Sequence, residues 1–339
     1  MLALVVDGPG ASAVRRVPEP VPGPGEVLVE VAAAGICGSD LEVLDGRRPA
    51  AYVDYPVVPG HEWAGRVLAL GEGVDGVAPG DPVVAEGLRS CGVCDRCAEG
   101  RTNICSAAYA ETGFTLPGAL AERLVVPARL LHRLPADRPL AAAALLEPAA
   151  CVASGLLELG VPRAGSRLAV VGDGPLGLLA LLLLRTTTPA ELVLVGARPA
   201  RSALGPACGA TQVVAAGDTD ALAGLAGRLD MVVEATNSPT GPVTALSLLR
   251  RGGSALLLGI SGAGRPAIDP DTVTLGQLRL QGGFAASRNA WRWVVGLYGD
   301  GILDPAPLVT HHFPLDAVDG AFAALTAADD GAVKILVHP

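Results

Sequence analysis

The stretch RLAVVGDGPLGLLALLLL, residues 167–184, decides the fold of this chain. It joins a strand pattern at 167–171, a Gly-x-Gly-x-x-Gly motif at 172–177 and an apolar helix pattern that ends at residue 184. The first glycine permits a tight turn, the second lets a ligand approach the backbone, and the third lets the helix pack closely on the strand. The N-terminus of the helix then faces phosphate groups. The stretch predicts a dinucleotide-binding unit with contacts from Gly172, Gly174, Pro175, Leu176 and Gly177.

Further apolar runs continue this pattern after the motif. Near-continuous apolar stretches at 191–195, 230–233 and 254–258 are separated by helix-length segments rich in Ala and Leu. Strands buried on both faces have this composition, and their alternation with helices is typical of a parallel sheet covered on both sides. The sequence therefore predicts an α/β fold with a doubly wound Rossmann sheet over residues 149–285.

The remaining segments differ in character. Residues 1–148 carry short apolar runs broken by Gly and Pro, such as 26–31, which is typical of antiparallel strands. After residue 285 the chain shows two helix patterns and a closing strand pattern, at 290–297, 318–327 and 333–337. Because this tail lacks a core of its own, residues 286–339 are predicted to complete the mostly β domain of residues 1–148.

The second strand pattern of the Rossmann half ends in Val195-Gly196-Ala197-Arg198. A site that selects NAD places an acidic residue at this point, where it contacts the ribose hydroxyls. Gly196 stands in place of the acid and is expected to leave room for a 2′-phosphate, which Arg198 and Arg201 can bind through their guanidinium groups. With Ala197 these residues predict NADP(H) in preference to NAD(H). The alternative is that the arginines only form the solvated start of a helix.

Four cysteines lie close together in the first half. Cys91, Cys94, Cys97 and Cys105 form the pattern C-x2-C-x2-C-x7-C. Four thiolates on so short a loop can close a tetrahedral zinc site of the structural type, with no position left for water. The alternatives are an iron-sulfur cluster, which also uses four cysteine thiolates, and a chance cluster of thiols. We predict structural zinc, and we assign Cys151 and Cys208 to packing.

Three further motifs carry ligands of the catalytic zinc type. They are Gly35-Ile36-Cys37-Gly38-Ser39-Asp40, Gly60-His61-Glu62 and Glu147-Pro148. A catalytic zinc needs about three protein ligands and an open position. Taken singly, each residue has an ordinary structural explanation: a buried thiol, a hydrogen-bonded core histidine or a surface acid. Their occurrence together favours a metal site.

These motifs, in this order, resemble the zinc-containing medium-chain dehydrogenase/reductase family, the group of alcohol, sorbitol and threonine dehydrogenases, over essentially the whole chain. The resemblance implies a GroES-like catalytic domain that carries a zinc-binding loop. It also implies that Cys37, His61 and Glu147 bind the catalytic zinc and that Glu62 can enter or leave this set. Asp40 would orient His61.

The resemblance further implies a chemistry. Zinc would polarise the oxygen of an alcohol or ketone, hydride would pass between the carbinol carbon and the nicotinamide, and Ser39 would relay the proton. Many members have a histidine where this chain has Glu42, which puts the last step of that proton path in doubt. Segments 55–63 and 111–114 resemble aminocyclitol dehydrogenases of the deoxy-inosamine type. The substrate is expected to be a secondary alcohol with further polar groups, such as a polyol, cyclitol or amino alcohol, or else a simple aliphatic alcohol.

Composition excludes other classes of protein. The chain has 339 residues and a net charge of −9, without a basic run that would bind nucleic acid. Its densest apolar run, 176–184, is far shorter than the roughly 20 residues of a membrane span, and the N-terminus does not resemble a signal peptide. We therefore expect a cytoplasmic protein, and the family is dimeric or tetrameric. The rival hypotheses are an inactive NADP-binding protein of the same fold and a zinc-free quinone or enoyl reductase.

Overall fold

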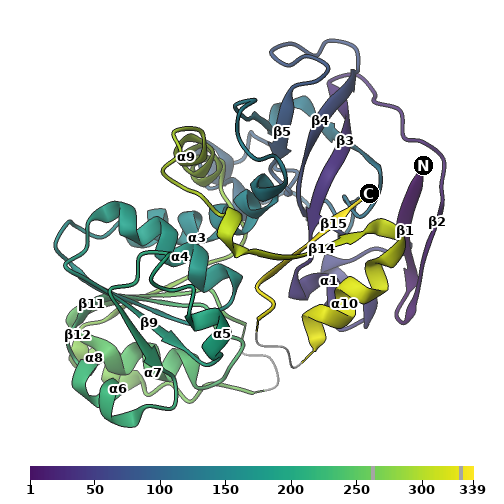
Figure 1. Ribbon diagram of the computed structural model, residues 1–339. Coiled ribbons are helices and arrows are strands. Elements are labelled where there is room, and N and C mark those ends of the chain that lie inside the picture. The colour runs from purple at the N-terminus through teal and green to yellow at the C-terminus, as the bar shows by residue number, and fades with distance from the viewer. Residues whose placement is uncertain (261–263, 328–330) are drawn as a thin grey trace. The chain divides into compact units, whose positions relative to one another are not determined.

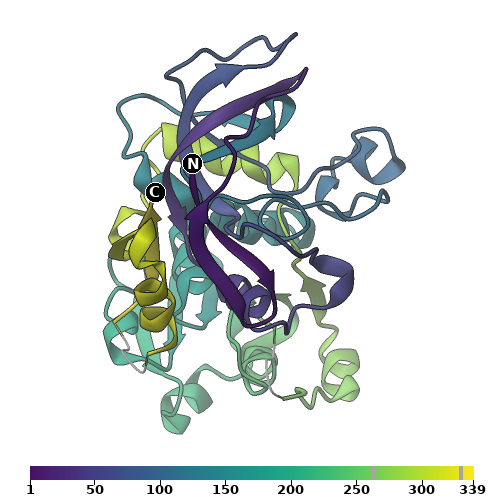
Figure 2. The ribbon, with the colours of Figure 1, turned by 90° about the vertical axis from the view of Figure 1, so that its right-hand side faces the viewer.

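The computed structural model describes residues 1–260, 264–327 and 331–339 (Figures 1 and 2). These residues divide into two compact units, one of Met1–Glu147 with Ser287–Pro339 and the other of Pro148–Ala286. Each unit has its own sheet and its own buried apolar core. The predicted fold class is confirmed, because a parallel Rossmann-type sheet occurs together with a separate, mostly β unit.

The first unit is built on a seven-stranded sheet in the order β14-β15-β3-β4-β5-β7, with β6 paired to β3. Its strands are β3 (Glu26–Gly35), β4 (Glu62–Leu70), β5 (Pro82–Ala85), β6 (Arg123–Pro127), β7 (Leu131–Arg133), β14 (Val309–Pro314) and β15 (Lys334–His338). All of these pairings are antiparallel except that of β14 with β15. A separate antiparallel ribbon is formed by β1 (Leu2–Gly8) and β2 (Ala11–Arg16).

Residues from both ends of the sequence share the core of this unit. The closing strand β15 lies beside β3, with Leu336 opposite Gly35 and Val337 opposite Ala34 (Figure 1). Phe322 and Val318 pack in the same apolar cluster as residues of β3 and β4.

The helices of this unit are α1 (Gly38–Leu44), α2 (Asp95–Ala98), α9 (Arg288–Gly299) and α10 (Val318–Thr326). Its 3-10 turns are η1 (Ala50–Tyr52), η2 (Thr102–Ile104), η3 (Ala128–Leu130), η4 (Ala141–Leu145), η6 (Ala306–Leu308) and η7 (Leu315–Ala317).

The second unit contains a six-stranded, wholly parallel sheet in the order β10-β9-β8-β11-β12-β13. Its strands are β8 (Arg167–Val171), β9 (Glu191–Gly196), β10 (Gln212–Ala215), β11 (Leu229–Glu234), β12 (Leu249–Leu257) and β13 (Arg279–Gly282). The strand predicted at 167–171 is β8 itself, and those predicted at 191–195 and 230–233 each extend by one or two residues. The strand predicted at 254–258 begins earlier, at Leu249.

Helices cover both faces of this sheet (Figure 1). On one face, Gly155 of α3 lies against Leu256 and Gly177 of α4 lies against Val170. On the other face, Leu225 and Leu246 belong to the core cluster that contains Val232. The helices are α3 (Leu146–Leu159), α4 (Pro175–Leu184), α5 (Pro199–Ser202), α6 (Thr219–Leu225), α7 (Gly241–Leu248) and α8 (Pro270–Gly276), with a 3-10 turn η5 (Arg185–Thr187).

One helical stretch is long and apolar enough to cross a membrane, Ala141–Leu159, which joins η4 to α3. This stretch is not predicted by the densest apolar run of the sequence, 176–184, which lies outside it. Of the most apolar 18-residue window in this stretch, 78% is buried inside the protein. Buried core helices commonly pass the same length and composition test, so the stretch is weak evidence for a membrane span.

Candidate functional site

Asp40 joins the two loops that carry the first candidate metal ligands. Its carboxylate is fully buried and accepts a hydrogen bond from the backbone N–H of Cys37 at 2.9 Å and one from the backbone N–H of Gly60 at 3.2 Å. Gly60 has a φ of +97°, and a Cβ there would lie 2.8 Å from the backbone nitrogen of Leu120. The turn before His61 therefore requires glycine.

The two loops bring together three side chains that bind metals. The ligand atoms of Cys37, His61 and Glu62 all lie within 4.8 Å of one another. Nδ1 of His61 is buried and has no hydrogen-bond partner in the part of the chain that is described, although it lies 3.4 Å from Oδ1 of Asp40. A thiol, an imidazole and a carboxylate form a donor set that suits zinc. The residues present thus fit a bound metal ion.

The electrostatics of the three-residue group also favour a cation. Burial lowers the pKa of His61, but the negative charge of Asp40 and, to a smaller extent, that of Cys37 raise it well above its ordinary value. The same negative environment that holds a proton on the ring would hold a metal ion. A proton and a metal ion therefore compete for this site.

Glu62 is held by a residue far away in the sequence. Nζ of Lys334, on β15, lies 2.5 Å from Oε2 of Glu62 and 3.2 Å from the backbone oxygen of Ile36. A Cβ at Gly35 would lie 2.4 Å from Oε2 of Glu62, so only glycine leaves the carboxylate this space. The position of Glu62 is thereby fixed from two sides.

Ser39 and Glu147 are the other residues predicted for this site. Oγ of Ser39 lies 3.5 Å from Nε2 of His61. Glu42, which stands where many relatives have histidine, lies 3.9 Å from a guanidinium nitrogen of Arg48. Glu147 is the second residue of α3 and is half-buried. Its carboxylate is not among the ligand atoms that lie within 4.8 Å of one another in the described residues.

A group of polar and aromatic side chains borders the candidate metal ligands. The Phe114 ring centroid lies 4.7 Å from that of His61, and the guanidinium carbon of Arg48 lies 3.6 Å from the same Phe114 centroid. Arg48 donates a hydrogen bond to the Tyr109 hydroxyl at 3.0 Å and lies 3.8 Å from Glu111. Tyr109 also donates a short hydrogen bond to Glu111. Burial raises the pKa of Glu111, a shift that Tyr109, His61 and Arg48 partly oppose.

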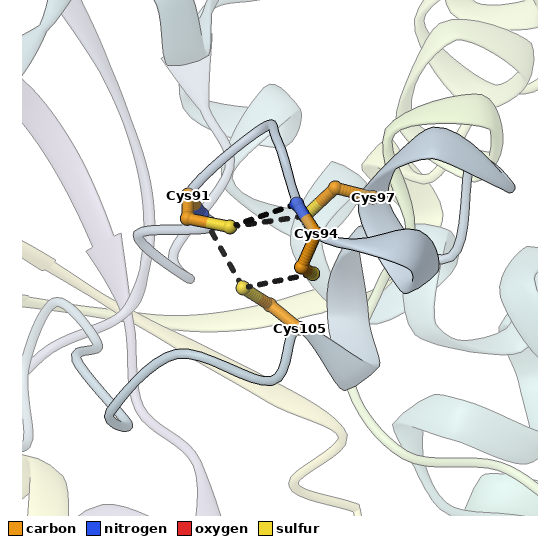
Figure 3. Close-up of side chains that lie close together, drawn as sticks. All are labelled: Cys91, Cys94, Cys97 and Cys105. Carbon is orange, nitrogen blue, oxygen red and sulfur yellow. Dashed lines mark hydrogen bonds between the residues drawn. The ribbon is translucent and has the colours of Figure 1, made fainter.

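The four-cysteine loop forms a second candidate metal site (Figure 3). The Sγ atoms of Cys91 and Cys97 lie 3.9 Å apart, as do those of Cys94 and Cys105. A regular tetrahedron with Zn–S distances of about 2.3 Å has S–S edges of about 3.8 Å, so the spacing fits zinc. Hydrogen bonds from Ser106 lower the pKa of the Cys94 thiol to about 5, whereas burial raises that of Cys97 to about 12.

The glycine motif forms a turn that can cradle a phosphate group. Gly172 has a φ of +121°, and a Cβ at Gly177 would lie 1.9 Å from the backbone oxygen of Gly172. Among the described residues, none has an atom within 4 Å of a Cβ built at Gly174, which precedes the N-terminus of α4 and therefore exposes its backbone. Pro175 and Leu176 occupy the first turn of that helix. The arrangement fits a dinucleotide whose phosphates approach the helix N-terminus.

The space beside Gly196 differs from the expectation. A Cβ at this residue would lie 2.0 Å from Oγ of Ser202 and 2.8 Å from Oδ2 of Asp173. The room that the sequence appeared to offer a phosphate is therefore filled by the protein itself. Ala197 and Arg198 are exposed, and Arg201 is half-buried.

Four residues of these sites are not among those predicted from the sequence: Arg48, Tyr109, Lys334 and Asp173. Two of them carried a signal. Lys334 is the only lysine among 25 basic residues, and Asp173 is an acid inside the glycine motif. No comparable local feature marks Arg48 or Tyr109, which lie 61 residues apart in the sequence.

Comparison with known proteins agrees with this geometry. Residues 23–136 match the model of the alcohol dehydrogenase GroES-like domain, and residues 143–338 match that of the glucose dehydrogenase C-terminus. D-Altritol 5-dehydrogenase from Agrobacterium fabrum is 35% identical over 298 residues, which is 86% of each chain.

Two solved structures share the whole fold. A zinc-binding dehydrogenase from Sinorhizobium meliloti 1021, bound to NADP, superposes with a TM-score of 0.92 at 29% identity, covering 100% of this chain and 99% of its own. A short chain alcohol dehydrogenase from E. coli CFT073, in complex with NADH, gives a TM-score of 0.91 at 25% identity and the same coverage. The family resemblance predicted from the motifs is confirmed. The chain belongs to the zinc-binding medium-chain dehydrogenase/reductase family and is an oxidoreductase of the alcohol and polyol dehydrogenase type.

Proposed function

We propose that this protein is a zinc-dependent dehydrogenase that transfers hydride reversibly between NADP(H) and a secondary alcohol bearing further polar groups. The polyol, cyclitol and amino alcohol classes meet this description. The convergence of Cys37, His61 and Glu62 within 4.8 Å supports the proposal most directly. These three donors can hold a metal ion and leave a position open for the substrate oxygen.

Two zinc ions per chain belong to the proposal, one catalytic and one structural. The catalytic ion would be held by Cys37 and His61 with a carboxylate from Glu62 or Glu147, and the structural ion by Cys91, Cys94, Cys97 and Cys105. When bound, the catalytic ion supplies Lewis-acid polarisation of the substrate oxygen. Asp40, which lies 3.4 Å from Nδ1 of His61, fixes the orientation of the imidazole.

The protein's own residues move and stabilise charge around the substrate. The Ser39 hydroxyl lies at the edge of the site, 3.5 Å from Nε2 of His61, where it can pass the substrate proton outward. Glu42 can accept this proton in place of the usual histidine, because its side chain keeps 32% exposure to solvent. The ammonium group of Lys334 neutralises Glu62 and thereby limits the negative charge at the site.

NADP(H) is the proposed coenzyme. The open backbone at Gly174 and the N-terminus of α4 provide for its pyrophosphate, and Arg198 and Arg201 lie in the segment that follows β9. That segment has no carboxylate of its own between Gly196 and Ser202. Its positive charge suits a 2′-phosphate better than a free ribose hydroxyl.

The cluster of Arg48, Tyr109 and Glu111 supports a polar substrate. Arg48 already donates to Tyr109 and to the backbone oxygen of Tyr52, and it lies beside both Glu42 and Glu111. Its guanidinium therefore already has partners within the protein and is a poor partner for a substrate carboxylate. Two carboxylates around one guanidinium leave the region negative, which suits hydroxyl or ammonium donors.

We expect a homodimer or homotetramer that acts in the cytoplasm on a small-molecule alcohol or ketone, without nucleic acid or membrane partners. None of the seven cysteines is paired in a disulfide.

Zinc analysis combined with a substrate screen tests the proposed function. Zinc per chain is measured on the purified protein, and the same sample is assayed with polyols, aminocyclitols and simple secondary alcohols at the NADPH absorbance band. About two zinc ions per chain with NADP-linked turnover of a polar alcohol are expected. One zinc ion without turnover would overturn the catalytic site, and turnover of simple alcohols alone would overturn the substrate class.

A further inference from the structure

A buried carboxylate from the glycine motif reaches the end of β9. Asp173 is 6% exposed, and its Oδ2 accepts a hydrogen bond from the backbone N–H of Arg198 at 2.6 Å. The same oxygen accepts a second hydrogen bond from Oγ of Ser202 at 2.8 Å. Asp173 thus ties the turn between β8 and α4 to the segment that carries both arginines.

This arrangement explains why residue 196 is glycine. A Cβ at Gly196 would overlap Oγ of Ser202, at 2.0 Å, and would crowd Oδ2 of Asp173, at 2.8 Å. A side chain at residue 196, the position from which an NAD-selecting site presents its acid, would therefore have to displace the Ser202 hydroxyl and the Asp173 carboxylate. The volume that such an acid would need is taken by Asp173 and Ser202.

We propose that Asp173 is a positioning residue that sets the coenzyme preference. It fixes the backbone of Arg198, and so the direction in which the guanidinium leaves the end of β9. It also blocks an acidic side chain at residue 196. The inference rests on the proposed preference for NADP(H) and assigns part of that preference to a residue of the glycine motif, outside the segment that carries Arg198 and Arg201.

The charge of Asp173 is compatible with a nearby phosphate. Oδ2 is occupied by two donors from the protein, and hydrogen bonds of this kind stabilise a carboxylate strongly. Arg198 and Arg201 in the same segment bring more positive charge than Asp173 removes. The carboxylate therefore accepts hydrogen bonds from the protein, and the arginines provide the positive charge for the ligand.

Binding measurements on coenzyme-free protein test this role without any assay of turnover. Dissociation constants for NADP+ and NAD+ are determined by isothermal titration for the wild type and for Asp173→Ala, Asp173→Asn and Ser202→Ala. Asp230→Ala is the matched control, because Asp230 also accepts a backbone N–H and an arginine donor in this unit, at Arg167 and Arg250. Circular dichroism monitors folding of each variant.

Loss of the carboxylate should loosen Arg198 and weaken NADP+ binding about tenfold, while NAD+ binding changes less than about threefold. Asp173→Asn keeps an oxygen that can accept both hydrogen bonds, so both constants should stay within about threefold of the wild type. Ser202→Ala removes one of the two hydrogen bonds to Asp173, so its loss of NADP+ affinity should lie between those of Asp173→Asn and Asp173→Ala. Asp230→Ala should leave the ratio of the two constants unchanged.

Three results would contradict the inference in different ways. If Asp173→Asn strengthens NADP+ binding and weakens NAD+ binding about tenfold, the carboxylate contacts the ribose directly and does not act by positioning Arg198. If the wild type prefers NADP+ but neither Asp173→Ala nor Ser202→Ala alters the ratio, only the role of Asp173 is wrong. If the wild type prefers NAD+, the proposed coenzyme preference is itself wrong. Should Asp173→Ala fail to fold, Asp173→Asn and Ser202→Ala still decide between these outcomes.

Discussion

Lys334 and Glu62 form a buried ion pair across 272 residues of sequence, with Nζ 2.5 Å from Oε2 and each side chain only 2% exposed. The pair joins the closing strand β15 to the start of β4, where the candidate metal ligands lie. Because Lys334 is the only lysine of the chain, the reactivity of this one side-chain amine shows whether the ion pair is intact.

Lys334→Met is expected to leave the Glu62 carboxylate buried without its partner and to lower the free energy of unfolding by about 3 to 5 kcal/mol. Urea denaturation measures the change. Arg47→Ala removes an exposed ion pair with Asp45 and serves as control, with little effect expected. Amine-reactive labelling of the wild type should modify the N-terminus while the protein is folded and Lys334 only after unfolding. Rapid labelling of Lys334 in the folded protein would contradict its burial.

Cys94→Ser is expected to remove the structural zinc and to lower the thermal midpoint, because a single lost thiolate opens the tetrahedral site. The measurement is metal content by mass spectrometry together with a thermal scan. Cys208→Ala lies outside both groups of candidate ligands and should leave the zinc content unchanged. Full zinc content in Cys94→Ser would show that the four-cysteine loop does not hold the ion.

Cys37→Ser and His61→Ala are expected to abolish turnover while NADP(H) binding persists, because the coenzyme-binding turn belongs to the other unit. Turnover is followed at the NADPH absorbance band and binding by isothermal titration. The zinc content of each variant should fall by one ion per chain at most, since the four cysteines of the loop are unchanged. Full activity in either variant would exclude that residue as a ligand.

The sequence predicted what local patterns encode. The strand before Gly172, the glycine spacing and the cysteine spacing each lie within a few residues, so the parallel sheet and the cysteine loop were accessible from the chain alone. The pairing of Glu62 with Lys334 and that of Arg48 with Tyr109 depend on contacts between distant segments, which no periodicity marks. The lack of an acid at residue 196 is visible in the sequence. The reason for it is not, because it is a contact in space with the side chains of Asp173 and Ser202.

Asp230 provides a pH-dependent contribution to the stability of the second unit. Burial alone would raise its pKa, but the backbone N–H of Arg167 and the guanidinium of Arg250 lower it below the ordinary value. The stabilisation is therefore complete above the unfolded-state pKa of about 3.9 and is lost as the pH falls through the lower folded-state value. Asp230→Asn should cost about 1 kcal/mol at pH 7 and progressively less below about pH 4. Urea denaturation at several pH values checks this, and a cost that is independent of pH would contradict it.

Glu111 and Glu42 offer a matched test of the substrate class, since both lie beside Arg48 but only Glu111 is deeply buried. If the cluster receives a hydroxyl or ammonium group of the substrate, Glu111→Gln should lower kcat/KM for that substrate about tenfold, mainly through KM, because a buried charged acceptor is lost. Glu42→Gln, with a side chain 32% exposed, should change KM little and instead slow kcat if Glu42 accepts the relayed proton. L-Threonine, whose carboxylate would meet this negative region, should be a poor substrate of the wild type. Efficient turnover of L-threonine, together with an unchanged KM in Glu111→Gln, would show that the cluster does not face the substrate.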